Sequence, residues 1–230
     1  MKYKHLFFDL DHTLWDYEAN AAEVLAELFQ RHNLDEVINS GERHFIEVFF
    51  QINDSLWDLY DRGLIHKSII RNERFDKILD QFGVRDVDLS RKINKDFMAE
   101  CPHKTNVVPG AVELLTFLKP NFGIHIVTNG FIEVQWIKLR KSGLDRFIDQ
   151  VFISEEVGAK KPEARFFEVT LGKVNCTPVE SLVIGDNLNT DIKGARDYGI
   201  DHVFYNPKKV KHNHNVTWEV DHLSQIAQLL

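Results

Sequence analysis

Five short apolar runs, separated by helix-like segments, constrain the fold of this chain more than any other feature. Each run has the length of a strand and is rich in Val, Ile or Phe: His5–Leu10, Gly123–Thr128, Gln150–Ser154, Ser181–Gly185 and His202–Tyr205. The helices expected between them are Ala111–Leu118, Phe131–Ser142, Pro162–Gly172 and Asp191–Tyr198. This alternation predicts an α/β fold with helices on both faces of a parallel sheet, which makes a three-layer core. Val216–Val220 and His222–Leu230 are expected to add a sixth edge strand and a closing helix.

A long stretch after the first strand breaks the alternation. From Trp15 to Lys104 there is no convincing strand, and apolar residues recur at helical spacing. Four amphipathic helices are expected there: Glu18–His32, Glu42–Asp61, His66–Phe82 and Asp88–Glu100. About 90 residues are too many for a crossover connection. We therefore expect a core made of residues 1–14 and 105–230, with a helical domain of residues 15–104 inserted into it.

Composition narrows the class of protein. The chain has 230 residues, of which 43% are hydrophobic and 27% charged, as in soluble globular proteins. No apolar run approaches the roughly 20 residues that span a bilayer. The N-terminus lacks a signal-peptide pattern, and Cys101 and Cys176 are expected to be free thiols, so we expect a cytoplasmic protein. The net charge of −7 argues against binding of nucleic acid polymers but leaves a small anionic substrate open, because a metal and a lysine can reverse the local field.

Polar residues with chemical potential follow the predicted strands at their carboxyl ends, where open parallel sheets bind ligands. They are Asp9 and Asp11 after the first strand, Thr128-Asn129-Gly130 at the second, Lys161 after the third, and Asp186 and Asp191 after the fourth. Burying two acids at a strand end costs several kcal/mol unless a cation or hydrogen bonds offset it. The sequence therefore predicts a metal-bound site for phosphoryl transfer.

These residues, in this order, resemble the four motifs of the haloacid dehalogenase-like (HAD) hydrolase superfamily. Asp9-Leu10-Asp11-His12-Thr13 is similar to the first motif, Thr128 to the second, Lys161 to the third, and Asp186 with Asp191 to the fourth. The resemblance covers essentially the whole chain, since the helical insertion lies where that superfamily carries a four-helix cap. It implies a Rossmann-like core with an inserted cap domain.

The resemblance also implies a mechanism. Asp9 is expected to be the nucleophile that forms an aspartyl-phosphate, and Asp11 the acid that protonates the leaving oxygen and later deprotonates water. Mg²⁺ is expected on Asp9, on the backbone carbonyl of Asp11 and on Asp186, because it prefers hard oxygen ligands.

The remaining motif residues are expected to bind phosphate or to support the ligands. Thr128, with backbone N–H groups around Asn129 and Gly130, is expected to hold phosphate oxygens, and Lys161 to neutralise their charge. Asp191 is expected to orient Lys161 or a metal-bound water. Thr13 and Asn187 are expected to support these groups without reacting.

The identity of the reaction depends on Asp11. The dehalogenases of the superfamily lack an aspartate at this position, because a halide leaving group needs no acid, so Asp11 favours a phosphate-monoester phosphatase. Within the superfamily the chain most resembles the cytosolic pyrimidine 5′-nucleotidase branch. That resemblance is carried by Leu56-Trp57, Gly63, Asn72-Glu73-Arg74-Phe75, Val127–Gly130 and Gly185–Gly194. It implies a nucleoside monophosphate as the substrate.

Other interpretations stay open. The chain could be a phosphatase for small metabolites such as a sugar phosphate or phosphoglycolate, or a sugar-phosphate mutase. It could also be a phosphate-sensing or partner-binding module in which Asp9 is phosphorylated but hardly turns over. Trp15 and Tyr17 are candidates for substrate contact, and His212 with His214 fits a polar loop better than a metal pair. The sequence gives no indication of the oligomeric state.

Overall fold

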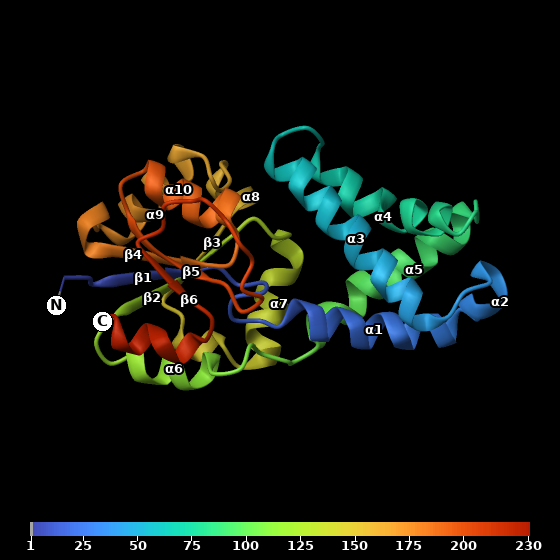
Figure 1. The fold of residues 1–230 in the computed structure, drawn as a ribbon, viewed down its shortest axis with the longest axis horizontal. Helices are drawn as coiled ribbons and strands as arrows, with labels where there is room; N and C mark the ends of the chain where they lie inside the picture. The colour runs from blue at the N-terminus through green and yellow to red at the C-terminus, as the bar shows by residue number, and fades with distance from the viewer. Residues whose placement is uncertain (1) are drawn as a thin grey trace. The chain divides into compact units, whose positions relative to one another are not determined.

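A computed structural model describes residues 2–230, which divide into two compact units (Figure 1). The core unit contains the chain up to Tyr17 together with Thr105–Leu230, and the helical unit contains Glu18–Lys104. The first boundary lies three residues after the predicted one, between residues 14 and 15. Trp15 belongs to the core unit because its N–H donates to Leu10 O at 2.9 Å and its backbone bridges to Val107.

The core unit is built on a six-stranded parallel sheet with the order β3-β2-β1-β4-β5-β6. The strands are β1 (His5–Phe8), β2 (Gly123–Thr128), β3 (Gln150–Ile153), β4 (Ser181–Gly185), β5 (Asp201–Tyr205) and β6 (Trp218–Val220). In the centre, Phe8 lies beside Ile126 and Ile184 in register, so the chain after β1 emerges between the ends of β2 and β4. The predicted parallel sheet and its sixth edge strand are confirmed.

Helices cover both faces of this sheet, which confirms the three-layer α/β core. They are α6 (Ala111–Leu118), α7 (Ile132–Ser142), α8 (Ser154–Val157), α9 (Ala164–Val174) and α10 (Lys193–Asp197). Figure 1 shows α9 and α10 on one side of the sheet and α6 on the other. Phe7, Val127 and Val183 of the sheet pack with Phe166 and Phe167 of α9 in one buried cluster. Burial of such aromatic and aliphatic side chains stabilises a core by about 1.5–3 kcal/mol each.

Besides shifts of one or two residues and the short helix α8, which was not expected, the structure differs from the sequence-based prediction at three places in this unit. The first strand ends at Phe8, so Asp9 and Asp11 lie in the loop that follows it. The helix expected from Asp191 begins earlier, as a π-helical turn over Leu188–Ile192 that leads into α10. The closing helix is a 3₁₀ helix over Leu223–Gln228, capped by the His222 side chain.

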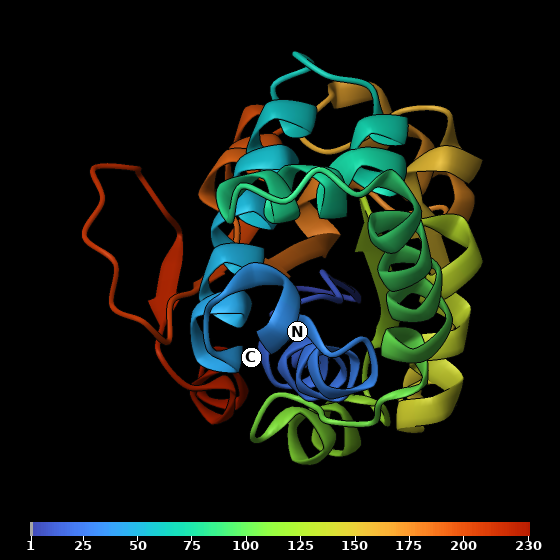
Figure 2. The same ribbon diagram turned by 90° about the vertical axis from the view of Figure 1, so that its right-hand side faces the viewer.

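The helical unit contains the four predicted helices and a short additional one. They are α1 (Tyr17–Arg31), α2 (Leu34–Ile38), α3 (Glu42–Asp61), α4 (Lys67–Gln81) and α5 (Val87–Glu100), followed by a 3₁₀ turn at Cys101–His103. Helix α4 packs on both α3 and α5, as Figure 2 shows. Their shared core includes Phe49, Phe75 and Phe97, and the Arg74 guanidinium lies 4.7–5.5 Å from these three rings. Within residues 2–230, no helix has the length and apolar character needed to cross a membrane.

At the amino-terminal end of the sheet, two histidines from adjacent strands meet. His5 Nδ1 lies 3.0 Å from His125 Nε2, and the His125 side chain is buried. Burial and the neighbouring His5 lower the pKa of His125 from 6.5 to about 4, with Lys119 acting in the same direction and Asp149 opposing it. The neutral ring is therefore strongly favoured in the folded protein.

We expect this histidine to make folding weaker in acid. Between pH 6.5 and pH 4 the unfolded chain binds a proton at His125 and the folded chain does not. The free energy of unfolding therefore falls as the pH falls. The loss reaches about 3 kcal/mol at most. Urea unfolding of the parent and of His125→Gln at pH 7 and pH 5 measures it, and the variant should lose less stability than the parent. His103→Gln, at an exposed position, is the control. Equal losses in the parent and His125→Gln would contradict the assignment.

Candidate active site

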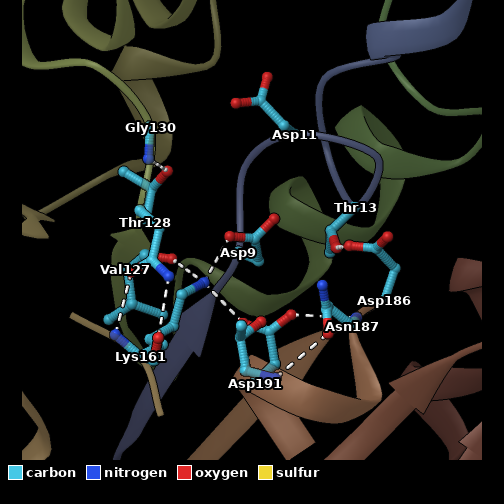
Figure 3. A network of polar contacts seen from close by, with 12 residues as sticks. Asp9, Asp11, Thr13, Val127, Thr128, Gly130, Lys161, Asp186, Asn187 and Asp191 are labelled. Atoms are coloured by element: carbon cyan, nitrogen blue, oxygen red, sulfur yellow. Dashed lines mark hydrogen bonds and ion pairs between the residues drawn. The ribbon is translucent and has the colours of Figure 1, made fainter. Parts of the chain in front are cut away.

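Lys161 lies at the centre of the polar cluster at the carboxyl ends of the strands (Figure 3). Its Nζ donates to Asp9 Oδ1 at 2.6 Å, to Asp191 Oδ1 at 2.6 Å and to the Val127 carbonyl at 2.8 Å. Only 2% of the lysine is exposed. These partners come from the ends of β1, β2 and β4. The structure thus brings together the third motif with the first and the fourth, as their positions in the sheet predicted.

Acidic groups outnumber cations in this cluster. Asp9, Asp186 and Asp191 each offer a carboxylate oxygen within 4.8 Å of the others, and within residues 2–230 Lys161 is the one ammonium that forms ion pairs with them. Burial raises the pKa of Asp9 well above its usual range, against the opposing charge of Lys161. Burial and the charge of Asp191 raise the pKa of Asp186 to about 6, although the charge of His12 opposes them. Excess negative charge on hard oxygen donors suits a divalent cation such as Mg²⁺.

Asp191 differs from the other two acids in how its oxygens are used. Its Oδ1 accepts from Lys161, and its Oδ2 accepts from the Asn187 N–H at 3.1 Å. Asp186 accepts a hydrogen bond from the Thr13 hydroxyl at 3.1 Å. Because protein donors already bind both oxygens of Asp191, Asp9 and Asp186 fit a metal better. Asp191 therefore has the contacts expected of a residue that orients Lys161.

The chain around Asp191 is shaped by its neighbours. The Asn187 side chain accepts from the N–H groups of Asn189 (2.8 Å) and Thr190 (3.2 Å), which starts the π-helical turn that carries Asp191. A Cβ at Gly185 would lie 2.3 Å from Asp191 Oδ2, so only a glycine leaves room for this carboxylate.

Thr128 is buried at the end of β2, with its hydroxyl oxygen engaged twice. It accepts from the Gly130 N–H at 3.0 Å and from Gln135 Nε2 at 2.8 Å. The Gly130 N–H, which we expected to face phosphate, thus donates to Thr128. A hydroxyl has two acceptor positions and one proton. With both acceptor positions used, the Thr128 proton is directed away from these two donors.

The side chain of Asn129 has a structural role that the sequence motif at Thr128 did not predict. Its Nδ2 donates to the Lys161 carbonyl at 2.9 Å, and the Lys161 N–H donates to its Oδ1 at 3.0 Å. This reciprocal pair fixes the backbone of Lys161 to the end of β2. Asn129 therefore holds the lysine in place through its side chain, in addition to any backbone contact with phosphate.

Asp11 points away from Asp9 (Figure 3), and residues of helix α7 bind its carboxylate. Its Oδ1 accepts from Lys138 Nζ at 2.6 Å, and its Oδ2 accepts from Gln135 Nε2 at 3.1 Å. Burial acts to raise the pKa of Asp11, but the charge of Lys138 and these hydrogen bonds outweigh it, so the pKa lies below the usual value. Sequence reasoning missed both α7 residues. Their spacing of three on the helix after Thr128 was the available signal.

The other candidates lie outside this cluster. His212 Nε2 is 3.1 Å from Glu219 Oε2 of β6, and its Nδ1 accepts from the His214 N–H, so both ring nitrogens have partners in β6 and the polar loop before it. Trp15 and Tyr17 are both buried in the core unit, where their rings lie beside the Lys138 ammonium.

Comparisons with known proteins show the family of this chain. A profile of haloacid dehalogenase-like hydrolases matches residues 3–199. The chain belongs to this family. The solved structure of the HAD-hydrolase YfnB from Bacillus subtilis, bound to magnesium, superposes with a TM-score of 0.89 at 28% identity, covering 100% of this chain and 99% of that one.

The names of several relatives of this HAD hydrolase state an activity. Pyrimidine 5′-nucleotidase PynA from Streptococcus pneumoniae is 30% identical over 93% of this chain and 88% of that protein. Pyrimidine 5′-nucleotidase YjjG from Escherichia coli is 30% identical over 100% and 99%, respectively. A glyceraldehyde 3-phosphate phosphatase from Pyrococcus furiosus is 32% identical over 88% and 80%. The relatives of this chain thus include phosphatases named for nucleotides and one named for a sugar phosphate.

We expect Mg²⁺ to stabilise this HAD hydrolase through Asp186. A ligand at one hundred times its dissociation constant raises the free energy of unfolding by about 2.7 kcal/mol. Thermal unfolding of the parent across a Mg²⁺ titration should show this shift, and Asp186→Asn should need at least about tenfold more Mg²⁺. Asp197→Asn, exposed on α10, is the matched control. An unchanged titration in Asp186→Asn would remove this residue from the metal site.

Proposed function

We propose that this HAD hydrolase is a Mg²⁺-dependent phosphate-monoester phosphatase with an aspartyl-phosphate intermediate, acting as a 5′-nucleotidase on nucleoside monophosphates. One observation carries the proposal: two acids two residues apart are held by different cations, Asp9 by Lys161 and Asp11 by Lys138. A phosphatase of this kind needs a nucleophile and a separate acid at one phosphorus atom. The family membership supports the reaction class.

Asp9 has the arrangement of a nucleophile. Lys161 binds its Oδ1, which leaves Oδ2 to attack phosphorus. In the first step a bond forms between Oδ2 and phosphorus, the bond to the leaving oxygen breaks, and that oxygen takes a proton from Asp11, which needs the protonated form that the contact with Lys138 disfavours in this structure. In the second step Asp11 takes a proton from water, the water oxygen bonds to phosphorus, and the bond to Oδ2 breaks.

The phosphate oxygens would be bound by the groups around Asp9. The Thr128 proton, directed away from its two donors, is available to a phosphate oxygen. Lys161 supplies a fixed positive charge that needs no reorganisation during the reaction. Mg²⁺ held by Asp9, the Asp11 carbonyl and Asp186 would reduce the repulsion between the carboxylate and the phosphate.

The substrate is assigned from relatives and from the sequence of the helical unit. Two relatives of full or nearly full length are named pyrimidine 5′-nucleotidases. The relative named glyceraldehyde 3-phosphate phosphatase favours a sugar phosphate as the second candidate. We place the enzyme in the cytoplasm, where free thiols such as Cys101 and Cys176 persist.

Release of inorganic phosphate from a panel of nucleoside monophosphates and sugar phosphates tests the substrate. We expect pyrimidine nucleoside monophosphates to give the highest kcat/KM with Mg²⁺, EDTA to stop turnover, and Asp9→Asn to reduce it by at least about 10⁴-fold while folding is kept. Preference for a sugar phosphate would keep the phosphatase and discard the nucleotidase. Turnover by Asp9→Asn close to that of the parent would refute the mechanism.

Asp11→Asn is expected to slow breakdown of the phosphoenzyme by about 10²–10⁴-fold, because a general base is then missing. Labelling Asp9 with acetyl phosphate and following loss of the label measures this step directly. Asp16→Asn, in the same segment, is the matched control. A label that decays equally fast in Asp11→Asn and the parent would remove Asp11 from this role. A label that persists for hours in the parent would favour the phosphate-sensing module.

A further inference from the structure

We propose that Lys138 and Gln135 of α7 are positioning residues that hold the Asp11 carboxylate so that it can take a proton from water, and that Lys138 acts on turnover only through Asp11. This inference rests on the proposed phosphatase function. It concerns two residues outside the four motifs, both on one helix and both buried.

The environment of Lys138 fixes its ammonium group. The side chain is 7% exposed, and its Nζ lies 2.6 Å from Asp11 Oδ1, 4.6 Å from the Trp15 ring centre and 5.7 Å from that of Tyr17. An ammonium is strongly hydrated in water, so burial needs an anion and aromatic faces to replace that water. All three partners come from the segment after β1. The lysine therefore ties that segment, and Asp11 above all, to α7.

Gln135 fixes the second carboxylate oxygen. It is fully buried, and its Nε2 donates both to Asp11 Oδ2 at 3.1 Å and to Thr128 Oγ1 at 2.8 Å. Its Oε1 has no hydrogen-bond partner among the described residues. The opposite orientation of the amide would turn an oxygen toward the carboxylate, which repels it. The amide thus joins the acid of the reaction to the hydroxyl that faces phosphate.

Gly130 makes room for this arrangement. A Cβ at that position would lie 1.7 Å from Gln135 Nε2 and 3.1 Å from Thr128 Oγ1. The glycine of the second motif therefore provides space for a protein side chain. The absence of a side chain at Gly130 thus lets the Gln135 amide lie between Thr128 and Asp11.

The two donors restrain the Asp11 carboxylate at both oxygens. Gln135 and Lys138 are three residues apart, which places them on the same face of α7. A carboxylate held in this way stays aligned, whereas one that has lost a donor can rotate about its side-chain bonds. Misplacement of a reacting group by about 1 Å can reduce a rate by about 10²-fold. The loss should fall on proton transfer rather than on binding of substrate.

Lys138→Met tests this expectation, since Met keeps the length of the side chain and removes the charge. We expect kcat for the best phosphomonoester of the panel to fall by about 10- to 100-fold, with KM changed less than about threefold. Lys138→Arg should recover part of the loss, because it restores a donor to Asp11 Oδ1. Lys141→Met, exposed on the same helix, is the matched control and should leave kcat unchanged. A parent-like kcat in a folded Lys138→Met would overturn the proposal.

A double-mutant cycle separates positioning from a general structural role. In Asp11→Asn, the further change Lys138→Met should alter kcat by less than about twofold, because the group it positions is gone. An equal fold-loss in both backgrounds would show that Lys138 acts independently of Asp11. If Lys138→Met does not fold by circular dichroism, Gln135→Leu replaces it in the same cycle with the same two outcomes.

Failure of the proposed function is recognisable separately. If the parent releases no phosphate from any compound of the panel, the phosphatase assignment fails. The positioning role is then decided by the lifetime of the acyl-phosphate that acetyl phosphate forms on Asp9. A lifetime at least tenfold longer in Lys138→Met than in the parent supports it, and equal lifetimes overturn it.

Discussion

The buried ammonium of Lys161 is the interaction on which the site depends. It lies between Asp9 and Asp191 and also donates to the Val127 carbonyl, so it joins the carboxyl ends of β1, β2 and β4. Breaking one side of such a buried pair leaves an uncompensated charge, which costs about 3–5 kcal/mol. The backbone of the lysine is also held in place, because the Asn129 side chain binds both its N–H and its carbonyl. The strand order therefore determines which charged groups surround Lys161.

Two acids that are nearly adjacent in sequence acquire different properties because each faces its own cation. Asp9 lies among other carboxylates, and burial raises its pKa against the charge of Lys161. Burial acts in the same direction on Asp11, but Lys138 and Gln135 outweigh it and lower the pKa. Different environments thus give the two carboxylates of one site different proton affinities. The loop after Phe8 makes this possible, since it brings Asp9 to Lys161 and Asp11 to Lys138.

The fold was largely readable from the sequence because its signals are local. Strand-length apolar runs predicted the sheet, and polar residues at their ends predicted which side chains meet around Lys161. The contacts of α7 were not readable, because Gln135 lies 124 residues from Asp11 and only packing of the helix on the core brings them together. The π-helical turn at Leu188–Ile192 was missed for a related reason. It depends on how the Asn187 side chain caps the backbone, which hydrophobic periodicity does not report.

The two motif glycines show what kind of information a pattern hides. Glycines beside phosphate sites are commonly explained by close approach of the backbone to the ligand. Here a Cβ at Gly130 would collide with the Gln135 amide, and one at Gly185 would collide with the Asp191 carboxylate. The Gln135 amide donates to Asp11 and Thr128, and the Asp191 carboxylate accepts from Lys161. Each glycine therefore encodes the position of a supporting residue. The motifs of this hydrolase specify the packing around the reacting groups as much as the reacting groups themselves.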